Sequence, residues 1–255
     1  MPSPSLLIKL GGSTLTSVAA IQAAAQAIAA LQASGYQPVV VHGGGPEIQA
    51  WLKRLNIESR FERGLRVTSP AAMEVIEMAL GRLSKDIAAA IGAAVGLSGK
   101  DAGTVRCRPL DAAVYGLVGE ITRIEPALLY HLVAGGFVPV LSCIALGEDG
   151  LTYNVNADMV AGAVAGVLQI PAVFISDVPG VLRDPKDRRS LLPQLSAAQV
   201  AELIAQGIIS GGMIPKVEAA LEAVRRGAPW SLLTDHLDAA ALAAQKHRGT
   251  RLHPS

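Results

Sequence analysis

The fold is decided by Val39–Ile48, which reads Val-Val-Val-His-Gly-Gly-Gly-Pro-Glu-Ile. Three β-branched residues in a row are typical of a buried central strand in a parallel sheet. Three glycines follow, and Pro46 stands where a helix accepts its first residue without losing a hydrogen bond. The pattern predicts a strand that turns directly into a helix, with free N–H groups that an anion can approach closely. By itself, such a turn fits anion binding and plain packing equally well.

The composition limits the class of protein. With 255 residues, 51% of them hydrophobic, the chain has enough core for one large α/β domain or two lobes. A net charge of +1 gives no basic field for nucleic acid, so we expect a small-molecule partner. Glycines and a proline interrupt the longest apolar region, Met159–Ile175, which favours a buried helix and strand over a membrane span. Met1–Ser5 shows no export signal, and Cys107 and Cys143 lack metal-ligand spacing, so we expect a reducing cytoplasm.

Strands and helices alternate along the chain. Leu6–Leu10 reads as a strand that ends at Gly11 and Gly12, Ser13–Thr16 offers cap residues for a helix to about Ser34, and Pro38–Val41 is the next strand. Later apolar strands recur between helical segments, at Ala93–Leu97, Phe137–Cys143, Ala172–Ser176 and Trp230–Thr234. This alternation is typical of an α/β protein with a mostly parallel sheet. Thr104–Arg108 and Tyr115–Ile124 predict a protruding β-ribbon, and His247 and His253 read as tail residues.

Lys9 is the first anomaly in this pattern. It lies near the carboxyl end of an otherwise apolar strand, where an unpaired ammonium group costs several kcal/mol, on the order of a buried ion's desolvation penalty. One interpretation is an edge strand with a solvated lysine. The other is that Lys9 points into a crevice at the strand ends and meets an anion, which is the usual ligand position in open α/β sheets.

Lys216 is the second anomaly. It follows Gly211-Gly-Met-Ile-Pro215 in the first turn of a predicted helix, where the helix dipole disfavours a cation unless an anion is also present. Two misplaced cations beside glycine turns fit phosphoryl transfer, in which fixed positive charges stabilise the moving phosphoryl group. No general base is needed if the acceptor is already ionised, as a carboxylate is.

Three polar residues carry both a structural and a functional interpretation. Arg66, in an irregular segment or short hairpin at Arg60–Thr68, is either a solvated side chain or the fork that binds a substrate carboxylate. Asn156 and Asp158 open a helix of small residues, where an N-cap and a first-turn acid are ordinary choices. In the functional interpretation, Asp158 holds lysines in place at the crevice.

Six motifs, in this order along the chain, resemble those of the amino acid kinase family, in particular its members that phosphorylate N-acetyl-L-glutamate. They are Lys9-Leu-Gly-Gly12, His42-Gly-Gly-Gly-Pro-Glu47, Gly64-Leu-Arg-Val-Thr68, Asn154-Val-Asn-Ala-Asp158, Ser176-Asp-Val-Pro-Gly-Val181 and Gly211-Gly-Met-Ile-Pro-Lys216. The resemblance spans nearly the whole chain. It implies a three-layer αβα open sandwich with a mostly parallel central sheet. It also implies an N-terminal lobe, residues 1–172, for substrate binding and dimerisation, and a C-terminal lobe, residues 173–255, for ATP.

The implied reaction transfers the γ-phosphoryl group of ATP to the side-chain carboxylate of N-acetyl-L-glutamate, giving an acyl phosphate for arginine biosynthesis. By the resemblance, Lys9 and Lys216 stabilise the transferring group and Asp158 orients both lysines. The substrate contacts implied are Gly44, Gly45, Arg66 and Asn156. The nucleotide contacts implied are Gly11, Gly12, Asp177, Val178, Pro179, Gly180, Val181, Leu182, Ile208, Ile209 and Ser210. Mg²⁺ is expected on phosphate oxygens and water, with no protein ligand named.

Two departures from the family pattern qualify this expectation. Only five residues precede Leu6, so we expect a form like the arginine-insensitive homodimers, which lack an additional N-terminal helix. Ser69 and Ala102 replace the acid and the glycine expected at their positions. Two rival hypotheses remain at this stage: a related kinase acting on a carrier-linked aminoadipate or another carboxylate or carbamate, and a catalytically silent amino-acid-binding module.

Overall fold

A central sheet organises the molecule. The computed structural model describes residues 5–244 and 246–253, so the expectation about Met1–Ser5 lies outside it except for Ser5. Within these residues eight strands pair in the order β12, β14, β13, β11, β1, β2, β8 and β5. Their bounds are β1 Ser5–Leu10, β2 Gln37–His42, β5 Ala94–Ser98, β8 Val138–Ser142, β11 Ala172–Ile175, β12 Gln194–Ser196, β13 Ser231–Thr234 and β14 Thr250–His253. All neighbours are parallel except β13 and β14. The predicted mostly parallel sheet is confirmed.

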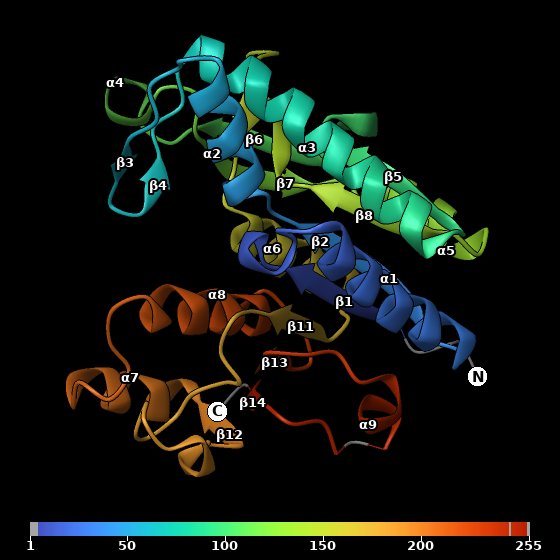
Figure 1. Cartoon of the computed structure of the whole chain (residues 1–255), viewed down its shortest axis with the longest axis vertical. Helices are drawn as coiled ribbons and strands as arrows, with labels where there is room; N and C mark the ends of the chain where they lie inside the picture. The colour runs from blue at the N-terminus through green and yellow to red at the C-terminus, as the bar shows by residue number, and fades with distance from the viewer. Residues whose placement is uncertain (1–4, 245, 254–255) are drawn as a thin grey trace.

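Helices cover both faces of this sheet (Figure 1). On one face α1 (Val18–Ala33) packs between α3 (Pro70–Ile91) and α9 (Ala239–Ala243). On the other, α6 (Ala157–Leu168) packs on β1 and β11 and against α8 (Met213–Arg225), while α5 (Ala127–Ala134) covers β8. The remaining helices are α2 (Gly45–Arg54), α4 (Ala112–Tyr115) and α7 (Ala197–Ala205), with 3-10 turns at Gly12–Thr14, Asp101–Gly103 and Arg188–Ser190. The result is the expected three-layer αβα sandwich.

A second sheet stands beside the first. Its strands pair in the order β10 (Thr152–Asn154), β9 (Ile144–Gly147), β6 (Val105–Pro109) and β7 (Gly119–Ile124). The antiparallel pair β6 and β7 is the predicted ribbon. A separate hairpin, β3 (Phe61–Glu62) and β4 (Leu65–Arg66), carries Arg66 as predicted. In Figure 1 these elements belong to the upper, N-terminal part, and β11 to β14 with α7 to α9 form the lower part.

Local sequence signals set most helix starts. The Asn156 side chain accepts hydrogen bonds from the N–H groups of Asp158 and Met159 at the start of α6, so the predicted cap is confirmed. Ser196 and Gln199 form a capping box at the start of α7. One boundary was wrong: α1 begins at Val18 and is capped by Ser17, because the residues after Gly11 form a 3-10 turn first.

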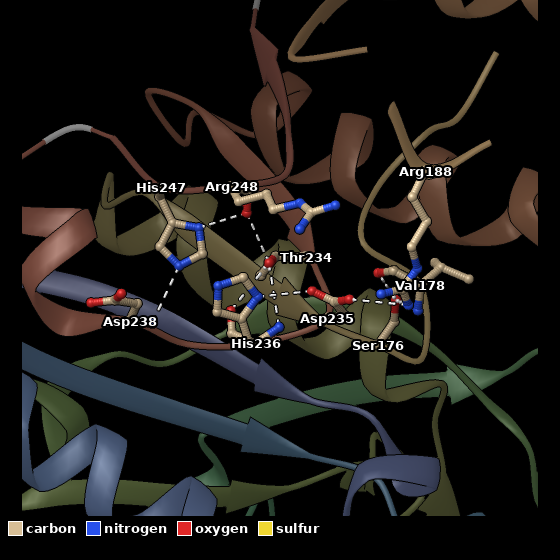
Figure 2. A network of polar contacts seen from close by, with 9 residues as sticks. All are labelled: Ser176, Val178, Arg188, Thr234, Asp235, His236, Asp238, His247 and Arg248. Carbon is tan, nitrogen blue, oxygen red and sulfur yellow. Dashed lines mark hydrogen bonds and ion pairs between the residues drawn. The ribbon is translucent and has the colours of Figure 1, made fainter. Parts of the chain in front are cut away.

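Near the C-terminal end of the chain, His236, Asp238, His247 and Arg248 take part in one network of polar contacts (Figure 2). His247 lies half-buried, its ring stacked on His236 with centroids 5.4 Å apart. Its Nε2 accepts from the N–H of Asp238 at 3.3 Å, so its Nδ1 donates to the Arg248 carbonyl at 2.8 Å. Burial lowers the pKa of His247, which keeps this arrangement neutral. His253 ends β14. The interpretation of both histidines as tail residues was therefore wrong, because short polar segments gave no sign of this pairing.

Candidate active site

Lys9 lies at the centre of the sheet, between Val41 of β2 and Phe174 of β11. Its side chain is 11% exposed, and its Nζ lies 2.7 Å from Oδ1 of Asp158 on α6. The edge-strand interpretation is thus excluded. A lysine in this position is tolerable because the paired carboxylate offsets much of the cost of its burial.

A cavity of about 390 Å³ opens at the carboxyl ends of β1 and β2. Its wall is formed by Gly12 after β1, by the triple-glycine turn at Gly43–Gly45, by the β3–β4 hairpin and by the start of α6. The predicted residues that line it are Lys9, Gly12, Gly44, Gly45, Arg66, Asn156 and Asp158. The structure thus brings together all four residues expected to contact the substrate and two of the three expected to act in transfer.

Two glycines of this wall, Gly12 and Gly44, lie in close contact with their neighbours. A Cβ on Gly12 would lie 2.8 Å from the nitrogen of Gly45, and one on Gly44 would lie 2.6 Å from Cδ2 of Leu80 on α3. Within the described residues, the N–H groups of Gly44 and Gly45 donate to no backbone or side-chain acceptor. The triple-glycine turn therefore presents unpaired donors at a helix start, as an anion cradle does.

Arg66 is buried at 8% exposure, and no carboxylate of the described residues pairs with it. Its guanidinium donates to Oε1 of Gln49 at 2.8 Å, to the carbonyl of Gly45 at 3.3 Å and to Oγ of Ser59, all neutral groups. It also lies over the ring of Phe61, 4.6 Å from its centroid. Burial lowers the pKa of Arg66. A buried cation held by neutral groups, on the wall of a cavity, is well suited to bind a substrate carboxylate.

Two further side chains complete the cavity. Asn156 uses only its carbonyl oxygen to cap α6, and its amide nitrogen has no hydrogen bond within the described residues. Cys143, which the sequence did not assign to the site, also lines the wall. Burial raises the pKa of Cys143 to about 12, so the thiol is protonated at neutral pH and does not act as a nucleophile.

A second, smaller cleft of about 110 Å³ adjoins the first through Lys9, Gly12 and Asp158. It is also lined by Gly11, Asp177 and Lys216. Both misplaced lysines therefore face one cleft, one contributed by β1 and the other by the first turn of α8.

Asp158 does not hold both lysines in this structure. Lys216 pairs instead with Asp177, directly after β11, and this hydrogen bond lowers the pKa of the Asp177 carboxyl. Asp158 is held to Lys9 in the same cleft. Asp177 was predicted only as a nucleotide contact, and nothing in the sequence distinguished it from Asp158 as the partner of Lys216.

The remaining predicted nucleotide contacts line neither cavity. They are Val178, Pro179, Gly180, Val181, Leu182, Ile208, Ile209 and Ser210. Some of their backbone groups serve the fold, since the N–H of Val181 donates to Oγ1 of Thr250 at 2.7 Å and its carbonyl accepts from Leu192 at 2.9 Å. The two segments flank β11 and α8, the elements that carry Asp177 and Lys216.

Across residues 5–244 and 246–253, no three His, Cys, Asp or Glu side chains are close enough together to hold a metal ion. The site carboxylates Asp158 and Asp177 are each engaged by a lysine. This donor set fits a Mg²⁺ ion that arrives on nucleotide phosphates and keeps water ligands, and does not fit an all-protein cage. Over the same residues, no helix is long and apolar enough to cross a membrane.

Two lysines that face one cleft between glycine turns, on a three-layer sandwich, form the arrangement that phosphoryl transfer favours. The sequence profile of the amino acid kinase family matches residues 5–233, and the chain belongs to this family. It is 46% identical to the acetylglutamate kinase of Deinococcus radiodurans over 98% of this chain and 100% of that protein. It is 49% identical to an acetylglutamate kinase of Thermus thermophilus over 90% of each.

Solved structures share the architecture. A Streptococcus mutans protein superposes with a TM-score of 0.80 at 28% identity, covering 99% of both chains. Carbamate kinase from Giardia lamblia, bound to AMP-PNP, superposes with a TM-score of 0.76 at 17% identity over 100% of each chain, which supports the fold alone.

Proposed function

We propose that this chain transfers the γ-phosphoryl group of ATP to the side-chain carboxylate of N-acetyl-L-glutamate, the acyl phosphate step of arginine biosynthesis. The observation that carries the proposal is the buried Arg66, held by neutral groups, on the wall of a cavity that also contains Lys9. The identity of 46% to 49% with acetylglutamate kinases supports the choice of acceptor.

The acceptor spans the 390 Å³ cavity from Arg66 to Lys9. Arg66 binds the α-carboxylate, and the free amide of Asn156 binds the acetamido end. The side-chain carboxylate then lies at the Lys9 end, beside the N–H groups of Gly44 and Gly45. Because this carboxylate is already ionised at neutral pH, attack on the phosphorus atom requires no general base.

Lys9 and Lys216 stabilise the charge that spreads over the transferring phosphoryl group. Gly11 and Gly12 allow phosphates to approach the backbone, and Asp158 and Asp177 hold one lysine each. The segments Asp177–Leu182 and Ile208–Ser210 shape the pocket for the nucleoside. Mg²⁺ carried by the nucleotide neutralises phosphate charge in the bound state.

The lobes and the assembly belong to the same proposal. Residues 1–172 bind the acceptor and dimerise, and residues 173–255 bind ATP, in a homodimer. We place the protein in the cytoplasm, which suits its two free, buried cysteines, Cys107 and Cys143.

Trapping of the acyl phosphate with hydroxylamine tests the reaction. The purified chain with ATP and Mg²⁺ is offered N-acetylglutamate, an aminoadipate derivative, or no acceptor. A hydroxamate formed only with N-acetylglutamate is expected. A stronger signal with aminoadipate would reassign the acceptor, and no signal with any acceptor would indicate a silent binding module.

A further inference from the structure

His42 is the residue before the triple-glycine turn, and it lies fully buried at the end of β2. In the parallel pairing of β1 with β2, His42 is the partner of Leu10, and the preceding pair is Lys9 with Val41. Because side chains alternate along a strand, His42 points to the face of the sheet opposite Lys9. That is the face covered by α3, and it places the imidazole outside both cavities of the site.

Both ring nitrogens of His42 are engaged. Nδ1 lies 3.0 Å from the carbonyl oxygen of Gly43, and Nε2 lies 2.7 Å from Oγ of Ser84 on α3. The Gly43 carbonyl can only accept, so in the neutral ring Nδ1 carries the proton and Nε2 accepts. The single proton of the Ser84 hydroxyl then goes to Nε2 rather than to the Leu80 carbonyl, which lies 2.9 Å from the same Oγ. Burial lowers the pKa of His42 to about 4, so the neutral form that this pattern requires is the one present at neutral pH.

This contact fixes the orientation of a peptide group. The carbonyl of Gly43 and the N–H of Gly44 belong to one planar trans unit and point in opposite directions. Since the Gly43 carbonyl is held toward His42, the Gly44 N–H points away from it. Gly44 lines the 390 Å³ cavity, and its N–H has no acceptor within the described part of the chain.

Helix α3 supplies the rigid support. A Cβ on Gly44 would lie 2.6 Å from Leu80 and 3.1 Å from Leu83, so the turn rests directly on this helix beside Ser84. Without the imidazole, two glycines in succession leave this peptide free to rotate. We propose that His42 is a positioning residue that sets the Gly43–Gly44 peptide so that its N–H faces the oxyanion bound in the cavity. This inference rests on the proposed phosphotransfer to a carboxylate.

Three replacements separate this role from plain packing. Asparagine places its amide donor where Nδ1 lies, glutamine reaches the position of Nε2, and leucine fills the space without a donor. We expect His42→Asn to keep kcat/KM for N-acetylglutamate within about threefold of the unmodified chain, and His42→Gln and His42→Leu to lose at least roughly tenfold. The KM for ATP should stay within about twofold in all three, because the imidazole lies outside the cleft that holds Lys216.

The matched control is Ser142→Ala, a buried serine aligned with His42 on the neighbouring strand β8 and outside both cavities. It should leave the kinetics unchanged. Circular dichroism confirms folding of each variant, and if His42→Leu fails to fold, the comparison of Asn with Gln decides alone. The positioning role would be overturned if the His42→Gln variant were as active as His42→Asn, or if His42→Leu kept an unaltered kcat/KM.

Failure of the proposed function is visible separately, because the unmodified chain would then give no hydroxamate with N-acetylglutamate. In that case calorimetric titration of N-acetylglutamate into the unmodified chain and the His42→Asn and His42→Gln variants applies the same comparison to binding. We expect binding weaker by roughly tenfold or more for His42→Gln only. Equal affinities would refute the role of His42 as well.

Discussion

Acidification should destabilise this protein through His42. Burial lowers the pKa of His42 from its usual value of 6.5 to about 4 in the folded chain. Between these values the unfolded state binds a proton that the folded state does not, so stability is complete above pH 6.5 and falls as the pH drops toward 4. One pKa unit corresponds to about 1.4 kcal/mol, so the loss amounts to roughly 3 kcal/mol. That is a large share of the 5–15 kcal/mol typical of a folded domain, on the order of a fifth or more.

Urea unfolding at pH 7, 5.5 and 4.5 measures this loss, and His42→Asn isolates it because asparagine does not titrate. We expect the unfolding free energy of the unmodified chain to fall more steeply than that of His42→Asn, with the two curves converging at low pH. The exposed His131 provides the control, because His131→Asn also removes one imidazole but leaves His42 in place, so this variant should keep the steep curve. Parallel curves for the unmodified chain and His42→Asn would refute the assignment of a buried neutral imidazole.

Three further outcomes follow from the site and the backbone. Lys9→Ala and Lys216→Ala should each lower kcat by two or more orders of magnitude, since one lost transition-state donor costs about 3 kcal/mol. The rate of hydroxamate formation measures this loss, and unchanged turnover in both variants would refute the role of the lysines. Arg66→Lys should raise the KM for N-acetylglutamate by roughly tenfold or more with kcat nearly intact, because an ammonium group cannot make a bidentate contact with the α-carboxylate. A lower kcat at constant KM would mean that Arg66 acts in the transfer step instead. Ala102→Gly should stabilise the chain by roughly 0.5–1 kcal/mol, because Ala102 has a φ of 51°, where a residue with a side chain is strained. Urea unfolding measures this gain, and a loss of stability would contradict the reason.

The sequence was most informative where a residue type conflicted with its setting. Lys9 in an apolar strand indicated a buried partner, and the structure supplies Asp158. Ala102 stands where a glycine is expected, and its φ of 51° is a backbone conformation that favours glycine. Asn156 as the cap of α6 followed from local chemistry alone. Such signals work because they depend on neighbours a few residues away.

Long-range pairing could not be predicted in the same way. Lys216 had two acidic candidates, and only the position of α8 beside the end of β11 selects Asp177 over Asp158. Likewise, the stacking of His236 on His247 joins two segments whose meeting depends on β13 and β14 (Figure 2). Side-chain type limits what a residue can bind, and the three-dimensional path of the chain decides which partner it reaches.

Gly12 lies directly against Gly45, so the turn after β1 and the triple-glycine turn meet through their backbones. A single methyl group at Gly12 would lie 2.8 Å from the Gly45 nitrogen, so bare backbone touches bare backbone with no flexible side chain between them to absorb movement. In the proposed reaction, a shift of the turn at Gly12 on nucleotide binding would be passed to the triple-glycine turn beside the acceptor. Each ligand would then change the affinity for the other by the same factor, which titration of one ligand in the presence and absence of the other measures.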